Sequence, residues 1–284
     1  MIRKSLFNGT FYPGTAAEIE RMLRVLRERA GEQPRVPHPP IVIVPHAAWQ
    51  YSGLAAVRGI ATLVASPPER IVLIGPSHRH YYLGFSLAGY EKYETPLGEI
   101  DVDLGLQQEL KDWTGSGFVP EAHAAEHSLE VIVPIIQYLL PGATKILPIL
   151  AGSVSRIDVN KMADALAALL DPMRDALVVS TDLSHFYTYE EARALDQKTL
   201  HLVIEGEEEE LIVRSGEGGR LCCGFTGVVV AIALSRRWKL GAPELLAYFN
   251  SGDTGGDRDS VVGYAALAYP PPKLAAENNT GTED

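Results

Sequence analysis

The chain contains 284 residues with a formal net charge of −11, and hydrophobic residues make up 46% of it. This acidic balance argues against nucleic acid or an anionic membrane as the main partner, because both carry negative charge themselves. The two cysteines are adjacent, which excludes a disulfide scaffold and favours a reducing compartment. Because there is no apolar leader and no run of twenty apolar residues, we expect a soluble, cytoplasmic protein with no membrane span.

The hydrophobic pattern predicts strands and helices that alternate along most of the chain. A helical pattern at residues 15–30 begins with Thr15 as N-cap and Glu18 as its capping-box partner. An interrupted strand pattern at residues 81–100 indicates a hairpin that turns at residues 96–98. Further strands are predicted at residues 41–44, 71–74, 145–150, 176–181, 244–250 and 260–269, and further helical segments at residues 54–65, 102–113, 131–140, 159–170, 190–204, 207–215 and 226–235.

No internal repeat longer than a strand followed by a histidine is present, and no break in composition divides the chain. We therefore expect a single α/β domain over residues 1–269. The remaining tail, residues 270–284, is rich in proline and polar residues and is predicted to be disordered.

A short motif recurs at the ends of three predicted strands. The run at residues 41–44 is followed by Pro45 and His46, and the run at residues 71–74 leads to His78. In open α/β sheets, ligands and catalytic groups gather at the carboxyl ends of the strands. These histidines are therefore expected to lie at one edge of the sheet, together with the residues that follow the strand at 176–181.

Six side chains after strands or in glycine-bounded turns are candidates for chemistry: His46, His78, His127, Asp182, His185 and Cys223. Histidine, thiolate and carboxylate are the protein ligands of borderline transition metals. Two histidines with one anionic ligand would leave coordination positions open for substrate, as in a catalytic site. Cys222 is expected in the core and Cys223, beside Gly224, nearer the surface, but the sequence leaves the order of this pair open.

Other enzyme classes fit the sequence less well. His123 and His127 are four residues apart, but Glu126 directly precedes the second histidine, which is not the H-E-x-x-H order of zinc proteases. There is no G-x-S-x-G nucleophile elbow, and there is no Rossmann fingerprint or P-loop.

Seven motifs, in order, resemble the Memo family, whose bacterial and archaeal members are often called AmmeMemoRadiSam system protein B. They are NGTFYP, PHAAWQYSG, GPSHR, AAEHSLEV, STDLSHF, CCGFTG and DSVVGYAALAY, and the resemblance covers about residues 3–269. It implies a fold like that of the class III extradiol dioxygenases, with a central mixed sheet flanked by helices and a pocket at one edge. The chain departs from the usual PHAGY at Ala48 and Trp49, where an indole replaces a phenol and would change the polarity of the pocket.

The resemblance also implies the roles of the candidate residues. Two histidines and a cysteine bind the metal in Memo proteins, and these correspond to His46, His78 and Cys223; iron or copper is the implied ion. Asp182 and His185 would line the same pocket as orienting or proton-transferring groups. His127 would lie close by, and we assign these three residues to catalysis.

Two functions remain in competition. The first is a metal-dependent redox or dioxygenase-like enzyme that acts on a small molecule or peptide. The second is a non-catalytic binding or scaffold protein that uses the same pocket for a peptide or protein partner. The family's name also implies a radical-SAM partner protein.

Overall fold

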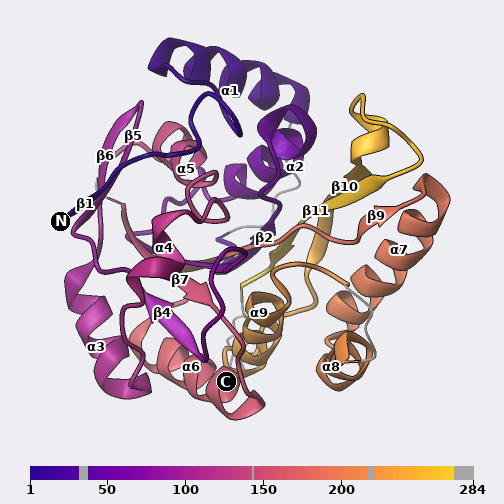
Figure 1. Cartoon of the computed structure of the whole chain (residues 1–284). Helices are drawn as coiled ribbons and strands as arrows, with labels where there is room; N and C mark the ends of the chain where they lie inside the picture. Colours follow the sequence, from indigo (N-terminus) through magenta and orange to yellow (C-terminus); the bar gives the residue numbers. More distant parts are fainter. Residues whose placement is uncertain (32–37, 143, 217–220, 272–284) are drawn as a thin grey trace, which may run out of the picture.

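The buried aliphatic runs of the sequence form one central β-sheet, which crosses the middle of the molecule (Figure 1). The structure is a computed structural model, and it describes residues 1–31, 38–142, 144–216 and 221–271. The sheet has eight strands. Their order is β10 (Glu244–Asn250), β11 (Val261–Tyr269), β2 (Ile41–Val44), β8 (Asp175–Ser180), β3 (Arg70–Pro76), β7 (Lys145–Ala151) and β4 (Phe85–Leu87), and β9 (His185–Tyr187) pairs with β11.

The middle of the sheet is parallel and its edges are antiparallel. β8 lies between β2 and β3 and runs parallel to both, and β3 runs parallel to β7. Residue pairs such as Val44 with Ser180 and Ile74 with Val179 align the carboxyl ends of these strands. Every residue of β2 and β8 is buried, as expected for strands that are covered on both faces. The predicted mixed α/β sheet is confirmed.

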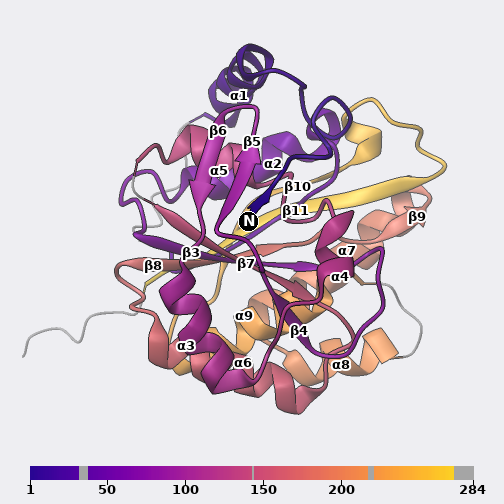
Figure 2. The same cartoon turned by 60° about the vertical axis from the view of Figure 1, so that its left-hand side comes forward.

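Helices cover both faces of the sheet, as both views show (Figure 2). One face carries α1 (Ala16–Ala30), α2 (Trp49–Ala61) and α5 (Val133–Leu139), and the other carries α3 (Leu104–Thr114), α6 (Arg156–Leu169) and α9 (Phe225–Arg237). α7 (Tyr189–Glu205) packs on β10 and β11, and α8 (Glu208–Gly216) packs on α7 and α9. The short helix α4 (Pro120–Ala124) and a small sheet of β1 (Ile2–Arg3), β5 (Lys92–Thr95) and β6 (Gly98–Asp101) complete these elements.

The first helix follows its sequence signals, but the second does not. Thr15 caps α1 by accepting the Glu18 backbone N–H, as predicted. α2 begins at Trp49 and ends at Ala61, whereas the hydrophobic pattern predicted residues 54–65. Gly59 lies within α2 although glycine disfavours a helix. The packing requires a glycine at this position, because a Cβ would lie 2.4 Å from Val44 Cγ1 in β2. Close packing of α2 against β2 thus overrides local propensity.

The ends of the chain bear on two further expectations. Residues 272–284 of the predicted disordered tail lie outside the described residues. Among the helices of the described residues, none is long and apolar enough to cross a membrane.

Candidate metal centre

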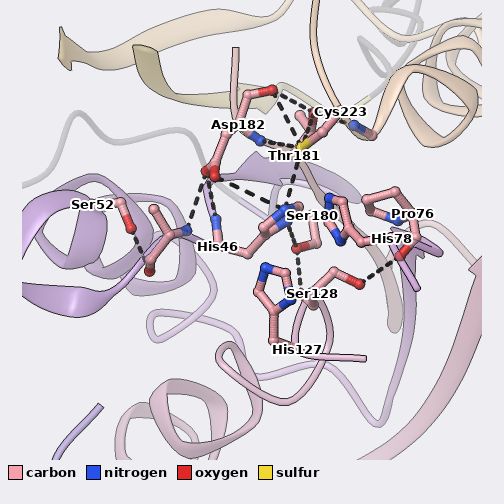
Figure 3. A network of polar contacts seen from close by, with 12 residues as sticks. His46, Ser52, Pro76, His78, His127, Ser128, Ser180, Thr181, Asp182 and Cys223 are labelled. Carbon is pink, nitrogen blue, oxygen red and sulfur yellow. Dashed lines mark hydrogen bonds and ion pairs between the residues drawn. The ribbon is translucent and has the colours of Figure 1, made fainter. Parts of the chain in front are cut away.

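The candidate residues meet at the carboxyl edge of the three adjacent strands β2, β8 and β3 (Figure 3). His46 follows β2, His78 follows β3 and Asp182 follows β8, as the strand-end motif predicts. Cys223 comes from a distant part of the chain, in the turn before α9. The side-chain donor atoms of His46, His78 and Cys223 all lie within 4.8 Å of one another, so these three residues could hold a metal ion.

His46 is the most deeply buried member, with 1% of its surface exposed. Its Nδ1 lies 2.7 Å from Ser180 Oγ, and its Nε2 lies 3.2 Å from Cys223 Sγ. Burial, reinforced by the neighbouring His78, lowers the pKa of His46 to about 3. The ring is therefore neutral at physiological pH, which is the form that binds a metal.

His78 is held by Glu126, a carboxylate that is 2% exposed. The Nδ1 of His78 lies 2.9 Å from Glu126 Oε1, and its backbone N–H donates to the other oxygen. Burial alone would raise the pKa of Glu126, but hydrogen bonds from His78 and from backbone amides lower it to about 2. Glu126 is thus ionised, and its contact with Nδ1 fixes the orientation of the His78 ring.

Cys223 is placed by the backbone around it. Its Sγ accepts the Asp182 N–H at 3.1 Å, and Gly224 N–H donates to Thr181 Oγ1 at 2.8 Å. A Cβ on Gly224 would lie 2.4 Å from the Ser180 carbonyl oxygen, so only glycine fits this turn. Burial and the charge of Asp182 raise the pKa of the Cys223 thiol.

Cys222 belongs to a different environment. It is buried in the hydrophobic core with 8% of its surface exposed. Burial raises the pKa of its thiol to about 12. Within the adjacent pair it is therefore Cys223 that faces His46, and Cys222 takes the core position.

Asp182 and His185 lie on the β8 side of the cluster. Asp182 Oδ1 accepts the backbone N–H groups of His46 at 2.9 Å and of Ala47 at 3.3 Å, and its Oδ2 lies 3.9 Å from His46 Nε2. Its carboxyl pKa is raised by burial. Asp182, His185 and Cys223 form a second group of donor atoms within 4.8 Å of one another.

His127 lies on the opposite side, stacked on His78 with ring centroids 4.8 Å apart. Its Nδ1 is 3.3 Å from Glu126 Oε1, and the Phe11 ring packs 4.5 Å from it. Burial lowers the pKa of His127 to about 4, with a further contribution from His46. All six candidates of the sequence analysis are therefore gathered in one place.

Comparison with known proteins shows the family to which the chain belongs. The family model described as Memo-like protein matches residues 3–268. The chain belongs to the Memo family. MEMO1 family proteins of Methanothermobacter thermautotrophicus and Methanobrevibacter smithii are 34% and 32% identical to it; the matches cover 94% of this chain in both cases, and 100% and 99% of the relatives. A solved structure of an uncharacterized protein from Escherichia coli K12 has a TM-score of 0.48 and 13% identity over 81% of this chain and 99% of that chain, a likeness too distant to bear on the site.

The donor set of this Memo family chain suits a transition metal. Metal–ligand bonds of about 2.0–2.3 Å place neighbouring ligand atoms of a tetrahedral site roughly 3.3–3.8 Å apart. The 3.2 Å between Cys223 Sγ and His46 Nε2 is close to that range. Two imidazoles and a thiolate are ligands for zinc, copper or iron, so the residues fit a metal without selecting one.

A pocket of about 480 Å³ opens beside the donor atoms. His78 and Cys223 form part of its wall, together with the loop after β3, the loop after β7 and the first turn of α9. His78 and Cys223 are thus accessible from the pocket, whereas His46 lies buried behind them. That arrangement is typical of a site that admits a substrate.

Two side chains behave differently from what the sequence indicated. Trp49 was expected to change the polarity of the pocket, but it is 1% exposed and donates from Nε1 to the Val131 carbonyl, within the core. Glu126 was considered only as part of a zinc-protease motif, yet it is a central partner of His78. The available signal was an acid directly before the candidate His127, because a carboxylate beside a histidine can hydrogen-bond the rings around it.

Proposed function

We propose that this Memo family protein binds one iron or copper ion through His46, His78 and Cys223 and serves a redox or dioxygenase-like reaction. The convergence of three donor atoms from three separate elements within 4.8 Å of one another carries the proposal. A bound ion would supply one-electron or dioxygen chemistry at the inner end of the pocket. The substrate is a small molecule or peptide that the pocket of about 480 Å³ can admit.

The other residues of the cluster provide orientation and proton transfer. Asp182 fixes the backbone turn at His46 through two N–H groups. Because burial raises its pKa, Asp182 can also hold a proton at Oδ2, which lies 3.9 Å from His46 Nε2. A ring nitrogen of His185 lies within 4.8 Å of an Asp182 carboxylate oxygen, and neutral His127 lies on the other side of the cluster; we assign both to proton transfer with the substrate.

Metal content tests the proposal directly. The wild-type protein, purified without added metal, should contain about one iron or copper ion per chain by elemental analysis. The triple variant His46→Ala/His78→Ala/Cys223→Ala should contain almost none. Equal metal content in the two proteins would refute the proposed site.

A matched control variant separates loss of ligands from loss of stability. His38→Asn/His201→Ala/Cys222→Ala removes the same residue types from positions outside every candidate donor group of the described residues. It should retain the metal content of the wild type. If it lost the metal as fully as the first variant, the effect would belong to the fold rather than to the site.

The pocket itself favours a second candidate function, in which the protein binds a peptide or protein partner without turnover. The two functions predict different responses to the same substitutions. A partner that stays bound after His46→Ala and Cys223→Ala supports the binding function. Loss of the partner together with the metal assigns both to one metal-dependent site.

A further inference from the structure

The Ser180 hydroxyl can donate its proton to only one of its two partners. Ser180 Oγ lies 2.6 Å from the Ser128 carbonyl oxygen, which can only accept, so the hydroxyl donates there. The same Oγ lies 2.7 Å from His46 Nδ1 and must act as the acceptor in that contact. His46 therefore carries its proton on Nδ1, and its Nε2 presents a lone pair to Cys223.

Glu126 imposes the same tautomer on His78. Its Oε1 accepts the backbone N–H groups of His127 and Ser128, each at 2.9 Å, and its Oε2 accepts the N–H of His78. A carboxylate surrounded in this way acts as acceptor for every partner. The contact from His78 Nδ1 to Oε1 at 2.9 Å therefore places the ring proton on Nδ1.

Ser128 joins the two arrangements into one. It is fully buried, its N–H donates to Glu126, its carbonyl accepts from Ser180, and its hydroxyl donates to the Pro76 carbonyl at 2.8 Å. It thus ties the end of β8 to the end of β3. The guanidinium of Arg3 holds the same segment from behind, through the Glu126 carbonyl at 2.8 Å.

We propose that Glu126 and Ser180 are positioning residues that set both histidines in the Nδ1–H tautomer and aim both Nε2 lone pairs at one point beside Cys223. The benefit of this positioning rests on the proposed metal-binding function. Its geometric content is independent of any metal. In metal sites, partners of this kind fix the ring and raise affinity, and their loss typically weakens metal binding about 10–100-fold.

Nitrogen NMR of the metal-free protein tests the tautomers. With histidine labelled by nitrogen-15, the ring nitrogens of His46 and His78 should show protonated Nδ1 and bare Nε2 at pH 7.5. Ser180→Ala should shift His46 toward the mixed tautomers of free imidazole, and Glu126→Ala should do so for His78. Glu126→Gln keeps an oxygen at the Oε1 position and should restore the tautomer of His78, which also covers the case that Glu126→Ala does not fold.

Titration with Co²⁺ tests the consequence for binding. Ser180→Ala and Glu126→Ala should each weaken Co²⁺ binding about 10–100-fold, followed through the thiolate-to-cobalt absorption band. Asp175→Asn is the matched control, because Asp175 is a buried carboxylate paired with Arg70 at the opposite end of β8 and β3. It should lower stability but leave the affinity for Co²⁺ close to that of the wild type.

The two measurements distinguish failure of the positioning role from failure of the metal-binding function. Unchanged ring shifts in Ser180→Ala and Glu126→Ala would overturn the positioning role, as would affinity losses no greater than that of Asp175→Asn. If the wild type bound no Co²⁺ while the predicted tautomers were observed, the metal-binding function would be wrong and the assignment of Glu126 and Ser180 would stand.

Discussion

A buried ion pair between Arg3 and Glu130 secures the N-terminal segment, and its removal allows a quantitative prediction. Arg3 is 5% exposed and Glu130 is 1% exposed, and Arg3 Nη1 lies 2.6 Å from Glu130 Oε2. The other oxygen, Oε1, accepts the N–H groups of Leu6 and Phe7 and the Tyr12 hydroxyl. Glu130→Gln can keep an oxygen at Oε1, but it turns an NH₂ group toward the guanidinium.

The magnitude follows from the charge that is left behind. Removing one partner of a buried ion pair destabilises a protein by about 3–5 kcal/mol, because the remaining charge is unpaired in a medium of low dielectric constant. For a domain of this size, that loss corresponds to a fall in Tm of roughly 5–10 °C. Arg3→Met leaves the Glu130 carboxylate with three neutral donors but removes the donor of the His123 and Glu126 carbonyls, so its cost should lie in the same range.

Urea denaturation of the two single variants and of the double variant Arg3→Met/Glu130→Gln measures the coupling. In the double variant the neutral amide no longer faces a cation, so its destabilisation should fall short of the sum of the single effects by at least about 1 kcal/mol. Strictly additive effects would refute the argument that an unpaired buried charge dominates.

Three further predictions concern the cluster. The pKa of the Cys223 thiol is raised and that of His46 is about 3, so at pH 7.5 the thiol carries a proton and the imidazole does not. Co²⁺ binding should therefore release about one proton per ion, and the affinity should rise about tenfold per pH unit. Calorimetry in two buffers measures this proton release, which should be lost in Cys223→Ala. Gly224→Ala should weaken Co²⁺ binding more than Gly227→Ala, because its Cβ meets a backbone carbonyl at 2.4 Å whereas that of Gly227 meets movable side chains at 2.9 Å or more. The pKa of Glu126 is depressed from 4.5 to about 2, so its contribution to the unfolding free energy is complete above about pH 4.5 and disappears as the pH falls through 2. The difference in unfolding free energy between wild type and Glu126→Gln should therefore vanish over that pH range. A difference that stays constant would contradict this reasoning.

Much of the fold was predictable because its strands carry their own signal. The runs at residues 41–44 and 244–250 were predicted with the bounds of β2 and β10, since both are bordered by loop residues that cannot extend them. The start of α2 was not predictable in the same way. Trp49, Ser52 and Gly53 are poor helix formers, and partners distant in the sequence stabilise this start: the Val131 carbonyl accepts a hydrogen bond from Trp49, and Leu26 of α1 packs against Gly53.

The candidate site was predictable to the extent that it follows strand ends. His46, His78 and Asp182 each come shortly after a hydrophobic run, so the sheet edge brings them together. Cys223 has no strand of its own, and the family resemblance supplied its role. The partners of the rings, Glu126 and Ser180, could not be identified, because their contacts join residues 48 and 134 positions apart.

The position of β8 between β2 and β3 determines at which stage of synthesis and folding the cluster can form. β2 and β3 are not neighbours in the sheet, and β8, which joins them, is made long after both histidines. Asp182 is 136 residues beyond His46, and Cys223 is 177 residues beyond it. A nascent chain on the ribosome therefore displays both histidines without the scaffold that brings them together. The complete donor set arises only in the finished fold, so an ion bound by this set would be acquired late and would not nucleate folding, unlike in small zinc domains.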